Sequence, residues 1–250
     1  MSRNTIRGTI AGMADRANPA FASGVVLVSI ITLTYAVTVA TIRHHTYVHV
    51  MAGVLWTGTD IFLGAVLGPV VGGLTEEQSA AVFRRLTPKT SFLLPSMAFV
   101  TIAAGITLAQ RVGIFPHAEP WLAIFTTVNL IPVLLLLGWR LDAWSDWRWQ
   151  VPFAFVTVGS LSWVGLTIGR FQMTTPAIAV SLGIVTILSV QGFGFLMPGE
   201  VRMYLEMTSD DPDPGVISAI GQQNAKLGGV QGVFQLALIV VMVYLRYGGF

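Results

Sequence analysis

The sequence predicts an all-α fold, a polytopic transmembrane helical bundle of about seven spans. Of its 250 residues, 54% are hydrophobic and 10% are charged, whereas soluble domains carry about 25% charged residues. The mean hydropathy of the chain is +0.72. Several apolar runs reach the length of about 20 residues that a helix needs to cross a bilayer. These observations together indicate an integral membrane protein, with the lipid bilayer as its principal partner.

Seven apolar runs qualify as spans. They cover residues 24–42, 47–74, 90–109, 121–141, 151–169, 175–197 and 228–245. The second run is long enough to tilt or to protrude from the bilayer. The longest connection, 198–227, contains the turn sequence 209–215 followed by a helix start.

The basic residues predict the orientation, because cytoplasmic loops carry an excess of Lys and Arg. One side of the predicted bundle holds Arg3, Arg7, Arg16, Arg84, Arg85, Lys89, Arg140, Arg148, Arg202 and Lys226. The other side holds Arg43, Arg111, Arg170 and Arg246. The N-terminus is therefore predicted inside and the C-terminus outside.

The chain divides into an N-terminal segment and one membrane domain. Residues 1–23 place Ile6, Ile10 and Met13 at helical spacing beside arginines, a pattern typical of an interfacial amphipathic helix. Residues 24–250 form a single transmembrane helical-bundle domain. A signal peptide over the first span is the alternative, disfavoured because no convincing small-x-small cleavage site follows.

Composition excludes several kinds of function. The chain has no cysteine, which rules out disulfides, iron–sulfur clusters and thiol catalysis. The net charge of +2 is small and the basic residues do not form a patch, so nucleic acid is not expected as a partner. A metal or haem would have to bind through His, Met, Tyr or carboxylate side chains.

The second span carries a polar stripe. At about 100° per residue, His45, His49, Trp56 and Asp60 fall within roughly 60° of one another on one helical face. His45 and His49, four residues apart, can present two imidazoles to a metal ion, or one to a haem. His117 is expected on the same outer side and completes a candidate metal set. The alternative is interfacial histidines that hydrogen-bond to headgroups or backbone.

Asp60 stands out as a carboxylate well inside an apolar segment. An ionisable group at that depth costs on the order of 3 kcal/mol on insertion scales. We expect either a proton or ion site or a structural acid that hydrogen-bonds between helices. Arg43, Arg111 and Arg170 are expected near the histidines, where they would contact haem propionates or lipid headgroups.

Glycines recur at helical spacing in two spans. Gly64, Gly68 and Gly72 share one face, and Gly228 and Gly232 repeat the pattern in the last span. Small residues allow helices to approach closely. These faces predict helix packing within the bundle or between protomers of an oligomer.

The run His49-x6-Trp56-x-Gly58 resembles the opening helix of a superfamily of bacterial and archaeal membrane proteins. The superfamily includes copper-resistance D-type proteins, HemJ-type protoporphyrinogen oxidases and the membrane part of cytochrome-linked urate oxidases. The resemblance extends over about residues 45–110. It implies a small helical bundle and, in some members, b-type haem or quinone-linked redox work, with His49 as the axial-ligand candidate. Asp60 departs from the superfamily pattern, in which many relatives are apolar or glycine there.

Two functions follow as expectations. The first is a cytochrome b-like redox protein that binds haem through His49, with His45 or His117 as second ligand, and exchanges electrons with a quinone or an extracytoplasmic partner. Arg43, Arg170 and Trp56 would line the cofactor, and Asp60 would handle protons. The second is a non-redox transporter or channel for a metal or small solute, or an accessory subunit of a larger membrane complex. Either would reside in the cytoplasmic membrane of a prokaryote.

Overall fold

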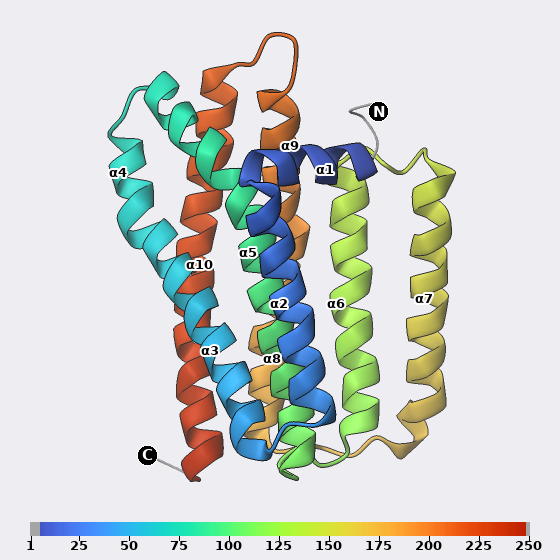
Figure 1. Ribbon diagram of the computed structural model, residues 1–250. Helices are drawn as coiled ribbons and strands as arrows, with labels where there is room; N and C mark the ends of the chain where they lie inside the picture. Colours follow the sequence, from blue (N-terminus) through green and yellow to red (C-terminus); the bar gives the residue numbers. More distant parts are fainter. Residues whose placement is uncertain (1–5, 249–250) are drawn as a thin grey trace. The chain divides into compact units, whose positions relative to one another are not determined.

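The computed structural model describes residues 6–248, and Figure 1 shows it as a set of long helices. Seven helices in this range are long and apolar enough to cross a membrane, which confirms the predicted spans. They are Pro19–Thr38, Ile42–Gly72, Glu76–Arg111, Ala118–Arg140, Trp147–Arg170, Pro176–Met207 and Pro214–Tyr247. A further helix, α1 (Ile6–Ala17), precedes them. Arg3, which contributes to the predicted orientation, lies outside the described residues.

The spans map onto helices α2 to α10. The first span is α2 (Pro19–Thr38), and the second combines α3 (Ile42–Ile61), η1 (Phe62–Leu67) and α4 (Gly68–Gly72). The next three are α5 (Glu76–Arg111), α6 (Ala118–Arg140) and α7 (Trp147–Thr167) with η2 (Ile168–Arg170). The sixth combines α8 (Pro176–Gln191), η3 (Gly192–Leu196) and α9 (Met197–Met207), and the last is α10 (Pro214–Tyr247).

Capping residues fix where several helices begin. The Asn18 side chain accepts a hydrogen bond of 2.9 Å from the Ala20 amide, and a proline follows it at the first helical position. The Thr41 hydroxyl accepts from the His44 amide at 3.3 Å at the start of α3. Thr175 plays the same role for α8. Short polar side chains at these positions satisfy amides that have no partner inside the helix.

The predicted start of the third span is wrong. It was expected at Thr90 after a loop that carries Arg84 and Arg85, but α5 already begins at Glu76. The early part of α5 is amphipathic: Ala80 and Phe83 are buried, whereas the two arginines are exposed. An apolar window misses this segment because its charged face lowers the mean hydropathy.

Helices also replace most of the predicted 198–227 connection. The sixth span continues to Met207, and α10 begins at Pro214. Its start is capped by Asp213, whose side chain accepts from the Gly215 amide at 2.7 Å. The turn and helix start predicted for 209–215 are therefore confirmed, but the connection is far shorter than expected.

Contacts between Cα atoms divide the chain into two compact units. Unit 1 comprises Met1–Leu108 and Gly199–Val233, and unit 2 comprises Ala109–Pro198 and Phe234–Phe250. Both α5 and α10 contribute residues to each unit. The predicted segment 1–23 belongs to unit 1. The single bundle domain predicted for 24–250 stays a prediction.

Glycines bring the helices of unit 1 into close contact. A Cβ atom added at Gly64 would collide with the Gly229 backbone, so α10 passes directly against η1. One added at Gly232 would lie 2.8 Å from Ile61 Cγ1. Gly72, by contrast, has no neighbour within 4 Å of such an atom. Part of the predicted glycine face thus packs within the chain.

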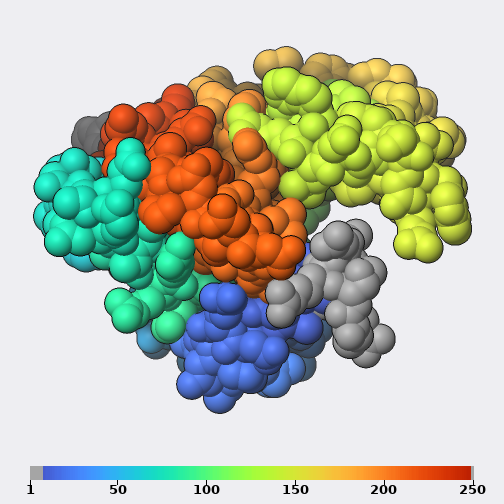
Figure 2. Space-filling model, turned by 90° about the horizontal axis from the view of Figure 1, so that it is seen from above, coloured from blue at the N-terminus to red at the C-terminus, as the bar shows by residue number. Residues whose placement is uncertain are grey.

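An apolar cluster and a short turn complete one end of unit 1. The cluster consists of Val71, Ala80, Phe83, Met203, Met207 and Ile217. Figure 2, seen from above, shows the early part of α10 in orange-red beside the start of α5 in teal. In agreement, a Cβ atom added at Gly215 would lie 3.0 Å from the Oε2 atom of Glu76. Helix α1 contacts α9, where Gly12 leaves room for the Tyr204 hydroxyl.

Unit 2 is held by apolar and aromatic packing. Its core cluster contains Phe115, Ile178 and Leu182, with Trp121 among the half-buried residues packed against it. The Trp121 indole donates to the Gln172 carbonyl at 2.9 Å.

Tryptophans also meet α6 at the other end of that helix. A Cβ atom at Gly138 would lie 2.5 Å from Trp149 Nε1 and 2.8 Å from Trp144 Cε2. The tryptophan-rich segment 139–149, expected from its sequence to be an interfacial aromatic belt, therefore has two indoles packed on α6.

Two spans contain a π-helical turn. The segment η1 begins two residues after Asp60, and η3 begins directly after Gln191. Single π turns inside α-helices are rare and occur often at functional sites. In this chain they place a widened turn directly beyond a polar side chain in each span.

Candidate functional site

Two histidines of α3 hydrogen-bond to main-chain carbonyls of α5 within unit 1. His45 Nε2 lies 3.0 Å from the Ala104 oxygen, and His49 Nδ1 lies 2.9 Å from the Thr101 oxygen. A carbonyl oxygen only accepts hydrogen bonds, so the contacting nitrogen of each ring must carry the hydrogen. In the neutral rings this assigns the Nε2–H tautomer to His45 and the Nδ1–H tautomer to His49.

The two rings differ in burial. His45 is fully buried, and its Nε2 also lies 3.2 Å from the Thr107 hydroxyl. His49 is half-buried, and in the described part of the chain no hydrogen bond engages its Nε2. His45 therefore anchors α3 to α5, whereas His49 retains a ring nitrogen suited to a ligand.

Gly105 makes room for the His49 ring. A Cβ atom at that position would lie 2.7 Å from His49 Cε1 and 3.0 Å from Nδ1. Real Cβ atoms do not approach ring atoms so closely, so any larger residue would displace the imidazole. The Ala-Gly pair at positions 104 and 105 thus lets both histidines reach the backbone of α5.

The C-terminal half of the polar stripe is deeply buried. Trp56 is 4% exposed and Asp60 is 0% exposed. A Cβ atom at Gly228 of α10 would lie 3.8 Å from both the backbone oxygen and Oδ1 of Asp60. The Asp60 carboxyl group therefore lies where α3 contacts Gly228 of α10. The π-helical segment η1 begins two residues later.

The start of α3 is polar and exposed. Arg43 and His44 both lie in its first turn and are exposed. The His44 Nδ1 atom is 2.7 Å from the Tyr35 hydroxyl. His44 therefore has a side-chain partner on α2, rather than the headgroup or backbone partner of the alternative prediction, and Arg43 is exposed beside it.

The remaining predicted residues belong to unit 2. His117 precedes α6 in a left-handed conformation, with φ of 55°. Arg170 forms an ion pair of 3.1 Å with Glu119, and both side chains are exposed. The three predicted metal ligands are thus divided between the units, and no group of three or more His, Cys, Asp or Glu among residues 6–248 is arranged to hold a metal ion.

Sequence reasoning missed a second acid inside unit 1. Glu200 of α9 is half-buried and accepts a hydrogen bond of 3.0 Å from the Thr90 hydroxyl of α5. The preceding Pro198-Gly199 pair resembles a helix end, which explains the omission. The signal that could have found it is the continuing helical spacing of the buried residues Met203 and Met207.

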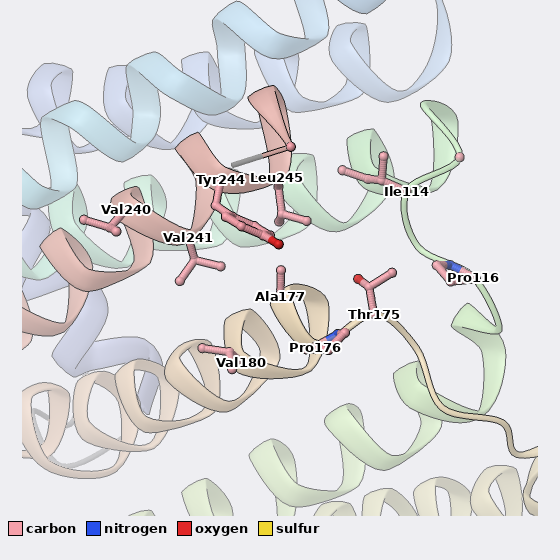
Figure 3. Close-up of a pocket in the computed structure, with 12 residues that line it drawn as sticks. Ile114, Pro116, Thr175, Pro176, Ala177, Val180, Val240, Val241, Tyr244 and Leu245 are labelled. Carbon is pink, nitrogen blue, oxygen red and sulfur yellow. The ribbon is translucent and has the colours of Figure 1, made fainter. Parts of the chain in front are cut away.

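Unit 2 contains an apolar pocket of about 630 Å³. Figure 3 shows its walls, formed by the chain before α6, the start of α8 and the end of α10, with the Tyr244 hydroxyl directed toward Ala177 and Thr175. The volume lies in the range of small-molecule sites. Its lining is almost entirely aliphatic, so it suits an apolar molecule.

No family model, curated protein or solved structure matches the chain. The resemblance to the H-x6-W-x-G superfamily therefore stays a prediction, and a functional proposal must rest on the geometry of unit 1.

Proposed function

We propose that the protein is a membrane-embedded, cytochrome b-like redox protein that binds a b-type haem through His49. The observation that carries the proposal is the Nδ1–H···O=C bond from His49 to Thr101. Histidines that bind metal centres usually donate their other ring hydrogen to a carbonyl or carboxylate, which fixes the tautomer and the ring orientation. The residues of the site therefore fit a haem iron at His49 Nε2.

The haem would supply one-electron chemistry, and the chain would supply the binding site. His49 would hold the cofactor, and Gly105 leaves space for the His49 imidazole. Arg43 would contact a haem propionate. His45 is a less suitable ligand, because it is fully buried and its Nε2 bonds to α5. Arg170 already pairs with Glu119. The electron partner would be a quinone or an extracytoplasmic protein, in the cytoplasmic membrane of a prokaryote.

An absorption spectrum of the purified protein tests this proposal. The dithionite-reduced minus oxidised spectrum should show the Soret and α bands of a b-type haem, and His49→Gln should abolish them. His44→Gln is the matched control, because His44 precedes it on the same helix but bonds to Tyr35. A wild-type protein without haem bands after haem supplementation would overturn the proposal.

The second candidate is a non-redox transporter or channel for a metal or small solute, or an accessory subunit of a membrane complex. The burial of Asp60 supports it, because an acid at 0% exposure in a membrane helix often marks an ion or proton path. Flux of a metal ion or small solute into vesicles, measured for the wild type and for Asp60→Asn, tests whether the protein is a transporter or channel. Loss of flux in the variant would support a transporter or channel, and unchanged flux would favour an accessory subunit.

A further inference from the structure

Glu200 is held by hydroxyl groups rather than by a positive charge. The Thr90 hydroxyl donates to Glu200 Oε1 at 3.0 Å, and the Ser91 hydroxyl is a second hydrogen-bonding neighbour of the carboxyl group. Both hydroxyls also contact the Thr87 carbonyl, at 3.1 Å and 2.8 Å. The carboxyl group thus lies in a small polar cluster formed by α5 and α9 in unit 1.

No cation neutralises this cluster. In the part of the chain that the structure describes, no Lys, Arg or His nitrogen lies within 4.0 Å of the Glu200 carboxylate oxygens. The cationic residues nearest in sequence on the helices that form or adjoin the cluster, Lys89 on α5, Arg202 on α9 and Lys226 on α10, are all exposed. Asn224 of α10, which is uncharged, lies against Gly199 beside the acid. An ionised carboxylate in such surroundings is costly, and a proton removes the cost.

Glu200 lies in the first turn of a short final helical segment of its span. Helix α9 ends at Met207, seven residues beyond Glu200, which corresponds to about 10 Å along the axis. The side chain is half-buried rather than sealed. Asp60, by contrast, has no exposed surface.

We propose that Glu200 is a proton-binding site, which exchanges a proton between unit 1 and the water at the end of α9. The carboxylate takes the proton from hydronium, becomes a neutral acid and leaves a water molecule, and the reverse step returns the proton. Hydroxyls suit both states, because they donate to a carboxylate and accept from an acid. The proposal does not depend on haem at His49.

Infrared difference spectroscopy of the full chain in lipid vesicles tests the site. Spectra collected over a pH titration should contain the C=O stretching band of a carboxylic acid that appears as the pH falls. Glu200→Gln should remove this band. Glu206→Gln is the matched control on the same helix, because the Glu206 carboxylate accepts from the Asp213 amide and caps the turn; it should leave the band unchanged.

A milder variant keeps the test decisive if Glu200→Gln does not fold. Thr90→Val removes the hydroxyl donor with little change of volume, and it should shift the frequency of the same band because the acid loses a hydrogen bond. The proposal is overturned if no titrating band depends on Glu200, or if its band persists unchanged at every pH at which the protein is folded.

Discussion

The two units of this chain differ in the contacts that hold their helices together. Unit 1 joins its helices through glycine contacts and buried polar groups, such as Gly64 against Gly229 and His45 against the α5 backbone. Unit 2 also has a glycine contact, at Gly138, and a bond of 3.2 Å from the Asn129 side chain to the Thr186 hydroxyl, but its described core is an aliphatic and aromatic cluster around Phe115 and Ile178. In a bilayer, apolar burial between helices gains little, because lipid tails are equally apolar.

The difference indicates where chemistry and specificity reside. Polar bonds and close backbone contacts define one arrangement of helices, while apolar packing tolerates exchange with lipid. Unit 1 holds buried Asp60, half-buried Glu200 and the bonded histidines, whereas unit 2 holds an apolar pocket. We therefore expect substitutions in unit 1 to have the larger effects.

The largest expected effect is that of Gly64→Leu. The new side chain would meet the Gly229 backbone, which cannot rotate away, so the destabilisation should reach or exceed about 3 kcal/mol, the upper range for overpacking. Gly58→Leu on the same span is the control, because nothing lies within 4 Å of a Cβ there. Thermal unfolding in detergent measures both, and equal transition temperatures would contradict the close contact.

His45→Ala should come next. It removes a fully buried ring and its bond to the Ala104 carbonyl, and the loss should be on the order of 2 kcal/mol. His44→Ala, at an exposed site, should cost much less. If both variants unfold at the same temperature, His45 does not anchor α3.

A smaller effect is expected between Ser79 and Ser218, which share a buried hydrogen bond of 2.8 Å between α5 and α10. Interhelical hydrogen bonds in membrane proteins average about 0.6 kcal/mol in double-mutant cycles. The two serine-to-alanine substitutions and their combination should give a coupling of that size in chemical unfolding. If the effects of the two substitutions on the free energy of unfolding are strictly additive, the bond between Ser79 and Ser218 does not stabilise unit 1.

The smallest effect is expected in unit 2, for Arg170 and Glu119. Both side chains are more than half exposed, and exposed ion pairs contribute about 0–1 kcal/mol. Glu119→Gln should leave the unfolding temperature nearly unchanged, and added salt should erase any difference. A large, salt-resistant loss would show that unit 2 also depends on charge.

The sequence was sufficient for the seven spans, because each contains a long apolar run. It was insufficient for the start of α5, where charged residues cover one face of a helix that is apolar on the other. The polar stripe on α3 was also predictable from its spacing. The partners of His45 and His49 were not, since backbone carbonyls of α5 carry no sequence signal. Glu200 was missed because its bond to Thr90 joins residues 110 positions apart.

The π turns bear on how the length of these spans can vary. A π turn accommodates one residue more than the α-helix around it. Deleting one residue within Phe62–Leu67 could therefore leave a continuous α-helix that still crosses the bilayer. Everything beyond the deletion would keep its depth and its face, because the π turn takes up the extra residue. An uninterrupted α-helix of the full sequence would instead rotate the later residues by about 100° relative to Asp60. The widened turn thus adjusts the helical register, so that Asp60, Gly64 and Gly68 face α10 together.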